Sequence, residues 1–171
     1  MLTLVLGGAR SGKSRHAEAL AKQLEQTGKR VIYVATAKAD DDEMHHRILR
    51  HQNDRPSHWQ TIETPVDLAH YLQHFDDQVV ILIDCLTLWM SNLLMLDAKL
   101  FDKYKNDFLG YLTSTTADVI MVSNETGLGV VPMGELTRRF VDEIGFLHQA
   151  IAVKADQVIF CVAGLPMTLK G

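Results

Sequence analysis

The chain has 171 residues, a length typical of one domain, so we expect a single domain over residues 1–171. Lys and Arg number 17 against 21 Asp and Glu, and the net charge of −4 argues against a dedicated nucleic-acid binder, which usually carries a basic surplus. The two cysteines lie far apart in apolar segments, which fits a reducing cytoplasm rather than a disulfide framework. No apolar run approaches the about 20 residues of a membrane span, and the N-terminal stretch is too short for a secretory signal.

Short apolar runs alternate with longer amphipathic stretches along the chain. The short runs predict buried strands, and apolar residues at helical spacing predict the helices between them. In chain order we expect a strand at 2–6, a helix at 13–26, a strand at 31–35, a helix at 40–52, a strand at 59–63, a helix at 65–74, a strand at 79–83, helices at 86–96 and 101–112, a strand at 118–122, a helix at 133–153 and a strand at 157–163. Because the strands are uniformly apolar, this order predicts an α/β fold with a mostly parallel central sheet and helices on both faces.

The first predicted strand runs into the phosphate-binding pattern G-x-x-x-x-G-K-[ST]. A strand precedes the pattern and a helix follows it, which is the context that a P-loop requires. Glycines let backbone N–H groups approach a polyphosphate at the positive end of the helix dipole. We therefore predict a nucleotide site in which Lys13 contacts the β- and γ-phosphates and Ser14 offers its hydroxyl to Mg²⁺. The predicted nucleotide contacts of this loop are Gly7, Gly8, Ala9, Arg10, Ser11, Gly12, Lys13 and Ser14.

A P-loop site of this kind also needs an acidic residue at the end of another apolar strand, where it holds the water shell of Mg²⁺. Asp84 follows the apolar run at 79–83 and meets that requirement. Asp84 could instead cap the helix predicted at 86–96, and the two roles are compatible.

Other strand ends are expected to meet the P-loop, because ligands of an open parallel sheet bind at the C-terminal ends of its strands. Val34, Ala35 and Thr36 end the second predicted strand and are therefore predicted nucleotide contacts. The segment at 123–132 also follows a strand and carries Asn124 and Glu125 at its start. Their position favours a functional role for this segment over that of an ordinary connector.

Four of the histidines lie within residues 45–58. They form no H-E-x-x-H pattern and the cysteines are not spaced as ligands, so a zinc site is not indicated. On a helix Met44, Ile48 and His51 share one face. His51 is then either a histidine at the rim of the core or an imidazole directed into the nucleotide cleft, and the spacing leaves both open.

Five segments form a more specific pattern: GGARSGKSRHAE at 7–18, VATA at 34–37, DDEMxxRIxxHxxxRPxxW at 41–59, IDCLT at 83–87 and SNETGLGVVP at 123–132. The P-loop alone is generic, whereas the H-x-x-x-R-P element and the N-E-x-G-x-G-x-V-P loop are much more specific. Together, over nearly the whole chain, they resemble the bifunctional adenosylcobinamide kinase / adenosylcobinamide-phosphate guanylyltransferase family of cobalamin assembly.

This resemblance implies a RecA-like P-loop fold and two successive reactions. ATP or GTP would phosphorylate the aminopropanol hydroxyl of adenosylcobinamide, and GMP from GTP would then pass to that phosphate, releasing pyrophosphate and giving adenosylcobinamide-GDP. The guanylyl group would travel on a histidine, and the family position matches His51 by its spacing to Arg55 and Pro56, with His46 as the next candidate. The family also implies a homotrimer.

Further nucleotide contacts are expected beside His51. Arg55 would contact phosphate through its charge, and Glu63 is a second expected contact. The residues Gln52, Asn53 and Asp54 complete the expected set. Mg²⁺, held by Ser14 and Asp84, is the expected cofactor.

Other functions fit the P-loop alone. A plain small-molecule kinase without nucleotidyl transfer would leave His51 structural, and a nucleotide-binding regulatory module would catalyse neither step. A RecA-like motor or DNA-binding ATPase is disfavoured by the net charge and by the lack of a basic arm. GTP labelled at its α-phosphate separates these functions, because only the transferase would acquire a covalent label.

Overall fold

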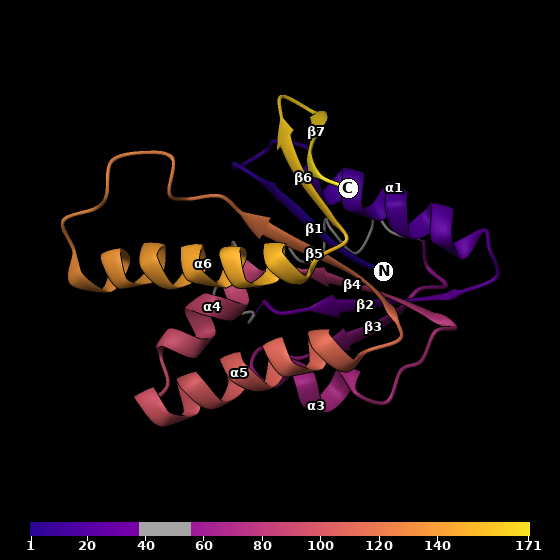
Figure 1. Ribbon diagram of the computed structural model, residues 1–171, viewed down its shortest axis with the longest axis horizontal. Helices are drawn as coiled ribbons and strands as arrows, with labels where there is room; N and C mark the ends of the chain where they lie inside the picture. The colour runs from indigo at the N-terminus through magenta and orange to yellow at the C-terminus, as the bar shows by residue number, and fades with distance from the viewer. Residues whose placement is uncertain (38–55) are drawn as a thin grey trace.

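One sheet organises the chain in the computed structural model, which describes residues 1–37 and 56–171 (Figure 1). Its strands are β1 (Leu2–Gly7), β2 (Arg30–Ala35), β3 (Gln60–Glu63), β4 (Val79–Asp84), β5 (Asp118–Asn124), β6 (Gln157–Val162) and β7 (Leu165–Lys170). The helices are α1 (Lys13–Glu25), α3 (Leu68–Leu72), α4 (Leu86–Leu94), α5 (Ala98–Ser114) and α6 (Glu135–Lys154). The strands lie in the order β3-β2-β4-β5-β1-β6-β7, and every pair except β6–β7 is parallel.

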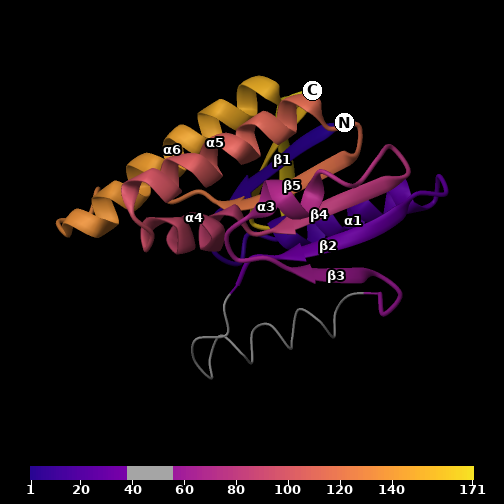
Figure 2. The same ribbon diagram turned by 90° about the horizontal axis from the view of Figure 1, so that it is seen from below.

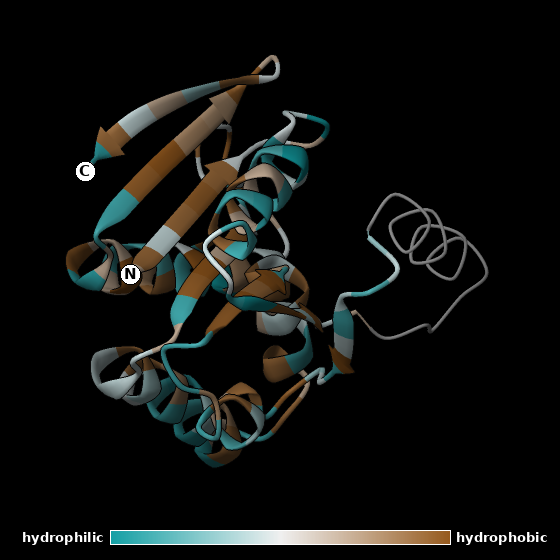
Figure 3. Cartoon of the chain, turned by 90° about the vertical axis from the view of Figure 1, so that its right-hand side faces the viewer, coloured by the Kyte–Doolittle hydropathy of each residue, from teal (hydrophilic) through white to brown (hydrophobic). Residues whose placement is uncertain are grey.

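Helices cover both faces of this sheet, as the sequence predicted. Helix α1 packs on one face, and α3 to α6 form a layer on the other (Figure 2). Successive strand residues point to opposite faces. Hence Leu4 and Leu6 pack on the side of α4 to α6, whereas Val5 between them packs on the side of α1. Figure 3 shows the result as inner strands that are mainly apolar, with polar residues on the outer sides of the helices.

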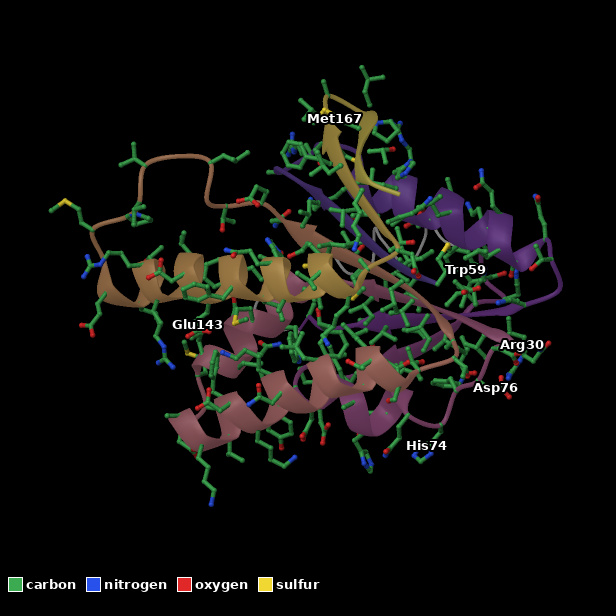
Figure 4. All side chains as sticks on the ribbon, in the orientation of Figure 1. Arg30, Trp59, His74, Asp76, Glu143 and Met167 are labelled. Carbon is green, nitrogen blue, oxygen red and sulfur yellow. The ribbon has the colours of Figure 1, made fainter. Side chains whose placement is uncertain are left out.

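Each layer contains one tryptophan. Trp89 of α4 is fully buried with Leu86, Met90 and Phe108, and its indole N–H donates to the carbonyl of Val66 at 2.6 Å. Trp59 lies in the apolar cluster on the α1 side (Figure 4), and its indole N–H donates to Glu25 at 3.0 Å. Both rings therefore combine a buried apolar body with a satisfied polar atom.

The predicted elements are confirmed wherever the structure describes them, with shifts of a few residues at their ends. The helix expected at 65–74 is shorter in the structure, because Asp67 accepts a hydrogen bond from the backbone N–H of His70 and caps α3. The helix expected at 40–52 lies outside the described residues.

Strand β7 was missed by the sequence analysis, and the sheet is accordingly not wholly parallel. Its residues are all exposed and include Pro166, so the alternation of Leu165, Met167 and Leu169 with more polar residues was not interpreted as a strand. The strand forms because Ala163 and Gly164 both have positive φ, 51° and 82°, and make the two-residue turn of a hairpin between Val162 and Leu165. In Figure 4 the labelled Met167 marks the position of β7.

The ends of β2 and β4 are joined by a buried side chain. Thr36 Oγ1 donates to the carbonyl of Cys85 at 2.7 Å and accepts from the Cys85 N–H at 3.0 Å. The carbonyl of Thr36 in turn accepts from the side-chain amide of Asn92 on α4 at 2.9 Å. Thr36 thus fixes the strand end beside Asp84 and connects it to the helical layer.

Replacing Thr36 by Val should lower the free energy of unfolding by about 1–3 kcal/mol, because the buried Cys85 N–H and C=O lose their partner while the side-chain shape is kept. Thr3→Val is the matched control, since Thr3 is equally buried on β1 and its hydroxyl has no hydrogen-bond partner in the described part of the chain. Urea unfolding of both variants measures the difference. Equal stability of the two would show that the Thr36–Cys85 contacts contribute nothing.

Candidate nucleotide-binding site

The carboxyl ends of the parallel strands meet along one edge of the sheet. The strand register places Gly7 of β1 opposite Asn124 of β5, and Asp84 of β4 between Val122 of β5 and Ala35 of β2. Ala35 is also opposite Glu63 of β3. The edge therefore carries the P-loop between β5 and β6, and three polar residues lie at the ends of the strands on the β5 side.

The P-loop turns tightly between β1 and α1. Arg10 and Gly12 have positive φ, 55° and 89°, and the N–H of Ser11 donates to the carbonyl of Gly8 at 3.3 Å. Gly12 is the N-cap of α1, and no side chain caps the N–H groups of the first helical turn. These N–H groups and the positive end of the helix dipole make the loop an anion-binding site.

Lys13 lies at the start of α1 and points back over the loop. Its ammonium donates to the carbonyl of Gly8 at 3.1 Å, which uses one of its three donor hydrogens. Its charge also reaches the end of β6, where burial raises the pKa of the Cys161 thiol and Lys13 works in the opposite direction. Lys13 therefore places a positive charge beside the loop N–H groups, where a polyphosphate would lie.

The hairpin between β6 and β7 packs directly against the P-loop. The N–H of Gly164 donates to the carbonyl of Ser11 at 2.9 Å. A Cβ at Gly12 would lie 3.0 Å from the Cα of Gly164, and a Cβ at Gly7 would lie 2.7 Å from the carbonyl oxygen of Cys161. Both loop glycines are thus needed for close packing of backbone on backbone.

Asp84 ends β4, two strands away from the P-loop strand, or about 10 Å at the usual strand spacing. It does not cap α4, because the N-cap of that helix is Cys85. Burial raises the pKa of the Cys85 thiol to about 11, with a further contribution from the negative charge of Asp84. A hydroxyl at Ser14 and a carboxylate at Asp84 are both oxygen ligands of the kind Mg²⁺ prefers, so this pair fits the ion.

A buried polar network joins the end of β5, the strand between β4 and β1, to helices α4 and α6. Ser123 Oγ is 2.7 Å from His148 Nε2 and 3.2 Å from Thr87 Oγ1, and Thr87 Oγ1 also accepts from the N–H of Asn124 at 2.7 Å. The N–H of Glu125 donates to the carbonyl of Gly7 at 3.1 Å. The end of β5 is therefore tied to the P-loop on one side and to α4 and α6 on the other.

The predicted nucleotide contacts at the end of β2 differ in how deeply they are buried. Val34 and Thr36 are fully buried, Val34 in the apolar core and Thr36 on Cys85, so neither offers exposed surface to a nucleotide in this structure. Ala35 is half-buried and Glu63 is exposed at the same edge. The predicted residues His51, Gln52, Asn53, Asp54 and Arg55 lie outside the described residues.

Sequence reasoning missed Thr87, His148 and Gly164. Thr87 and His148 stand in helices whose pattern indicates only a core-facing side, and nothing in the spacing links them to β5. Gly164 had a local signal, because a glycine between two short runs is a typical hairpin turn.

The fold and this edge together define an α/β P-loop nucleotide-binding protein. Solved structures of the same fold include the flagellar accessory protein FlaH from Methanocaldococcus jannaschii, with a TM-score of 0.57 and 16% identity over 99% of this chain and 77% of that chain. A second solved structure, described as an ATPase domain, matches with a TM-score of 0.53 and 14% identity over 93% of this chain and 68% of its own. At these identities the similarity shows the fold alone.

The chain belongs to the family described as cobinamide kinase / cobinamide phosphate guanyltransferase, whose model matches residues 3–169. It is 53% identical to the bifunctional adenosylcobalamin biosynthesis protein CobP of Pseudomonas aeruginosa, over 100% of this chain and 98% of that protein. It is also 36% identical to the Escherichia coli protein of the same description, CobU, over 99% and 100% of the two chains. Over residues 1–37 and 56–171, no helix combines the length and apolarity needed to cross a membrane.

The contact between Gly12 and Gly164 predicts a selective loss of nucleotide binding. Gly12→Ala should weaken ATP binding about tenfold or more, because its methyl group would displace the hairpin or the loop in addition to straining a positive φ. Gly28→Ala is the matched control, since Gly28 has φ +95° and open space around it at the far end of α1. Both variants should lose about 1–2 kcal/mol of stability to backbone strain.

Calorimetric titration with ATP and urea unfolding of the two variants separate strain from contact. If Gly28→Ala weakens ATP binding as much as Gly12→Ala does, the packing of the hairpin on the loop has no part in binding.

Proposed function

We propose that this protein phosphorylates adenosylcobinamide with ATP or GTP and then transfers GMP from GTP to the product, giving adenosylcobinamide-GDP and pyrophosphate. The observation that carries the proposal is the family match over residues 3–169, which contains both the P-loop and Asp84. The relatives with 53% and 36% identity are described as bifunctional and match along essentially their whole length. Both reactions transfer a phosphorus group from a nucleotide, so both require a site that binds and neutralises phosphates.

The residues at the sheet edge supply that site. The N–H groups of the P-loop and the Lys13 ammonium stabilise negative charge on the β- and γ-phosphates. Ser14 and Asp84 hold Mg²⁺, which neutralises further phosphate charge when bound. In the kinase step the nucleophile is the substrate hydroxyl, so the protein contributes mainly positioning and electrostatic stabilisation.

In the transferase step His51 carries the guanylyl group. A neutral imidazole nitrogen attacks the α-phosphorus of GTP, a P–N bond forms, and the P–O bond to pyrophosphate breaks. An oxygen of adenosylcobinamide phosphate then attacks the same phosphorus and displaces the imidazole. An imidazole of ordinary pKa, about 6.5, is largely neutral at pH 7 and can act in this way. Arg55, Glu63 and the residues 52–54 contact the nucleotide in this proposal.

A homotrimer in the cytoplasm completes the proposal. The connection from β5 to α6 exposes Leu128, Val130 and Met133, which are 78%, 98% and 94% accessible. Figure 1 shows this connection projecting beyond the sheet. Apolar side chains gathered on one projecting loop are typical of a surface that another subunit covers.

The principal alternative is a plain small-molecule kinase in which His51 has no covalent role. Incubation with GTP labelled at the α-phosphate distinguishes the two, because the transferase becomes labelled and a kinase does not. In alkali the label should persist, and in acid it should be lost, since a P–N bond hydrolyses when its nitrogen is protonated. A label stable in acid would indicate a phosphate ester of a hydroxyl group instead.

Lys13→Ala should lower kcat/KM of the kinase step at least about 100-fold and abolish the covalent label, because the variant loses the charge beside the phosphates. Lys22→Ala is the control, as Lys22 is an exposed lysine in the last turn of the same helix. Thermal unfolding should be similar for the two variants. Full kinase activity in Lys13→Ala would contradict the placement of the phosphates.

His51→Ala should separate the two activities. The covalent label should fall to background while most kinase turnover survives, because the kinase nucleophile is not the imidazole. His46→Ala serves as the neighbouring control and should keep both the label and the transferase activity. A label that persists in His51→Ala and vanishes in His46→Ala would move the carrier role to His46.

A further inference from the structure

A chain of side-chain contacts runs behind the carboxyl end of β5, and the function proposed above does not use it. It begins at Thr87 of α4, 3.2 Å from Ser123 of β5, and continues 2.7 Å to Nε2 of His148 on α6. The other imidazole nitrogen, Nδ1, faces Glu125 at 3.7 Å. Thr87, Ser123 and His148 are all buried, so three elements of the fold meet in a polar contact inside the helical layer.

One arrangement of protons satisfies all the contacts of this chain. Thr87 Oγ1 accepts from the N–H of Asn124, and either the Thr87 or the Ser123 hydroxyl can donate in the contact between them. With the imidazole proton on Nδ1, toward Glu125, Nε2 of His148 accepts from Ser123 and Ser123 accepts from Thr87. Burial lowers the pKa of His148, and Glu125 only partly offsets this, which favours the neutral imidazole of this arrangement.

The chain holds both neighbours of Asn124. Ser123 contacts His148 directly, and Glu125 is held by His148, by the N–H of Gly127 at 2.6 Å and, through its own N–H, by Gly7. Strand side chains alternate between faces, so Asn124 points to the side of α1 and the P-loop, opposite Ser123.

Asn124 stands at a position that a phosphate-binding site would use. It is the register partner of Gly7, and its strand lies between the P-loop strand and the strand that ends in Asp84. Its side-chain oxygen is buried and has no hydrogen-bond partner in the structure as described. The amide oxygen is therefore not committed to a hydrogen bond within the described chain.

We propose that His148 is a positioning residue for phosphoryl transfer: by holding Ser123 and Glu125, it directs the Asn124 amide toward the phosphates bound at the P-loop. This inference rests on the proposed function, since it supposes that a nucleotide is turned over at this edge. Neither residue reacts; His148 acts through Ser123 and Glu125, and Asn124 provides the contact.

His148→Leu removes both polar contacts, whereas His148→Gln keeps a polar atom near the position of Nε2 and can still contact Ser123. In His148→Leu, kcat for adenosylcobinamide phosphorylation should fall about 10- to 100-fold while the dissociation constant for ATP changes less than about twofold. His148→Gln should recover most of the lost kcat. Ile151→Val is the matched control, because Ile151 is buried on the same face of α6 and makes no polar contact.

A second variant tests the chain from its other end. Thr87→Val keeps the side-chain shape and removes the acceptor of the Asn124 N–H, so it should lower kcat in the same way. The double variant Thr87→Val/His148→Leu should be little worse than either single variant, because one chain is broken twice. The proposal is overturned if kcat is unchanged in His148→Leu, if Ile151→Val reproduces the loss, or if the losses in the double variant multiply.

The side-chain amide resonance of Asn124 gives a readout that needs no corrinoid. In the wild-type protein it should shift when ATP is added, and in His148→Leu the shift should shrink. A wild-type resonance that ATP does not move overturns the inference. A resonance that responds as expected, in a protein that leaves adenosylcobinamide unphosphorylated, supports the positioning by His148 and contradicts the proposed substrate alone.

Discussion

Two backbone hydrogen bonds from distant parts of the chain hold the P-loop in place. The N–H of Glu125 donates to the carbonyl of Gly7 and the N–H of Gly164 donates to that of Ser11. Because the two carbonyls are engaged by the flanking β5 and β6–β7 segments, the loop is held in one conformation before any anion binds. An anion site made of backbone needs this support, since a loop without it would lose conformational entropy each time it bound phosphate.

The same edge shows how a rigid core and a polar site are joined. The central strands β1, β2, β4 and β5 are buried on both faces and leave only their ends for chemistry. At those ends threonine and serine hydroxyls replace apolar contacts, as Thr36 does on Cys85 and Thr87 does on Asn124. A hydroxyl that bonds to backbone is short and fully buried, so it fixes a strand end without blocking the site.

Local sequence patterns predicted the fold and the phosphate-binding loop, but they did not predict the long-range contacts that support the loop. The apolar runs and the glycine pattern are short-range signals, and they predicted the parallel strands, the covering helices and the position of Asp84 at the same edge of the sheet as the loop. No sequence pattern indicated His148, because its partner Ser123 is distant in sequence and a single histidine on the core-facing side of a helix forms no motif. Thr36 lies at the predicted edge, but its side chain turns inward, because a strand end predicts proximity and says nothing about which side chains are buried.

The division of the core into two layers places one of the two tryptophans in each layer. Trp89 is enclosed among α4, α5 and the sheet, whereas Trp59 lies against α1 beside Glu25. The native chain thus has its two tryptophan fluorophores on opposite sides of one sheet. Removal of either indole leaves a single tryptophan, so the tryptophan fluorescence of each variant reports on the surroundings of one layer alone.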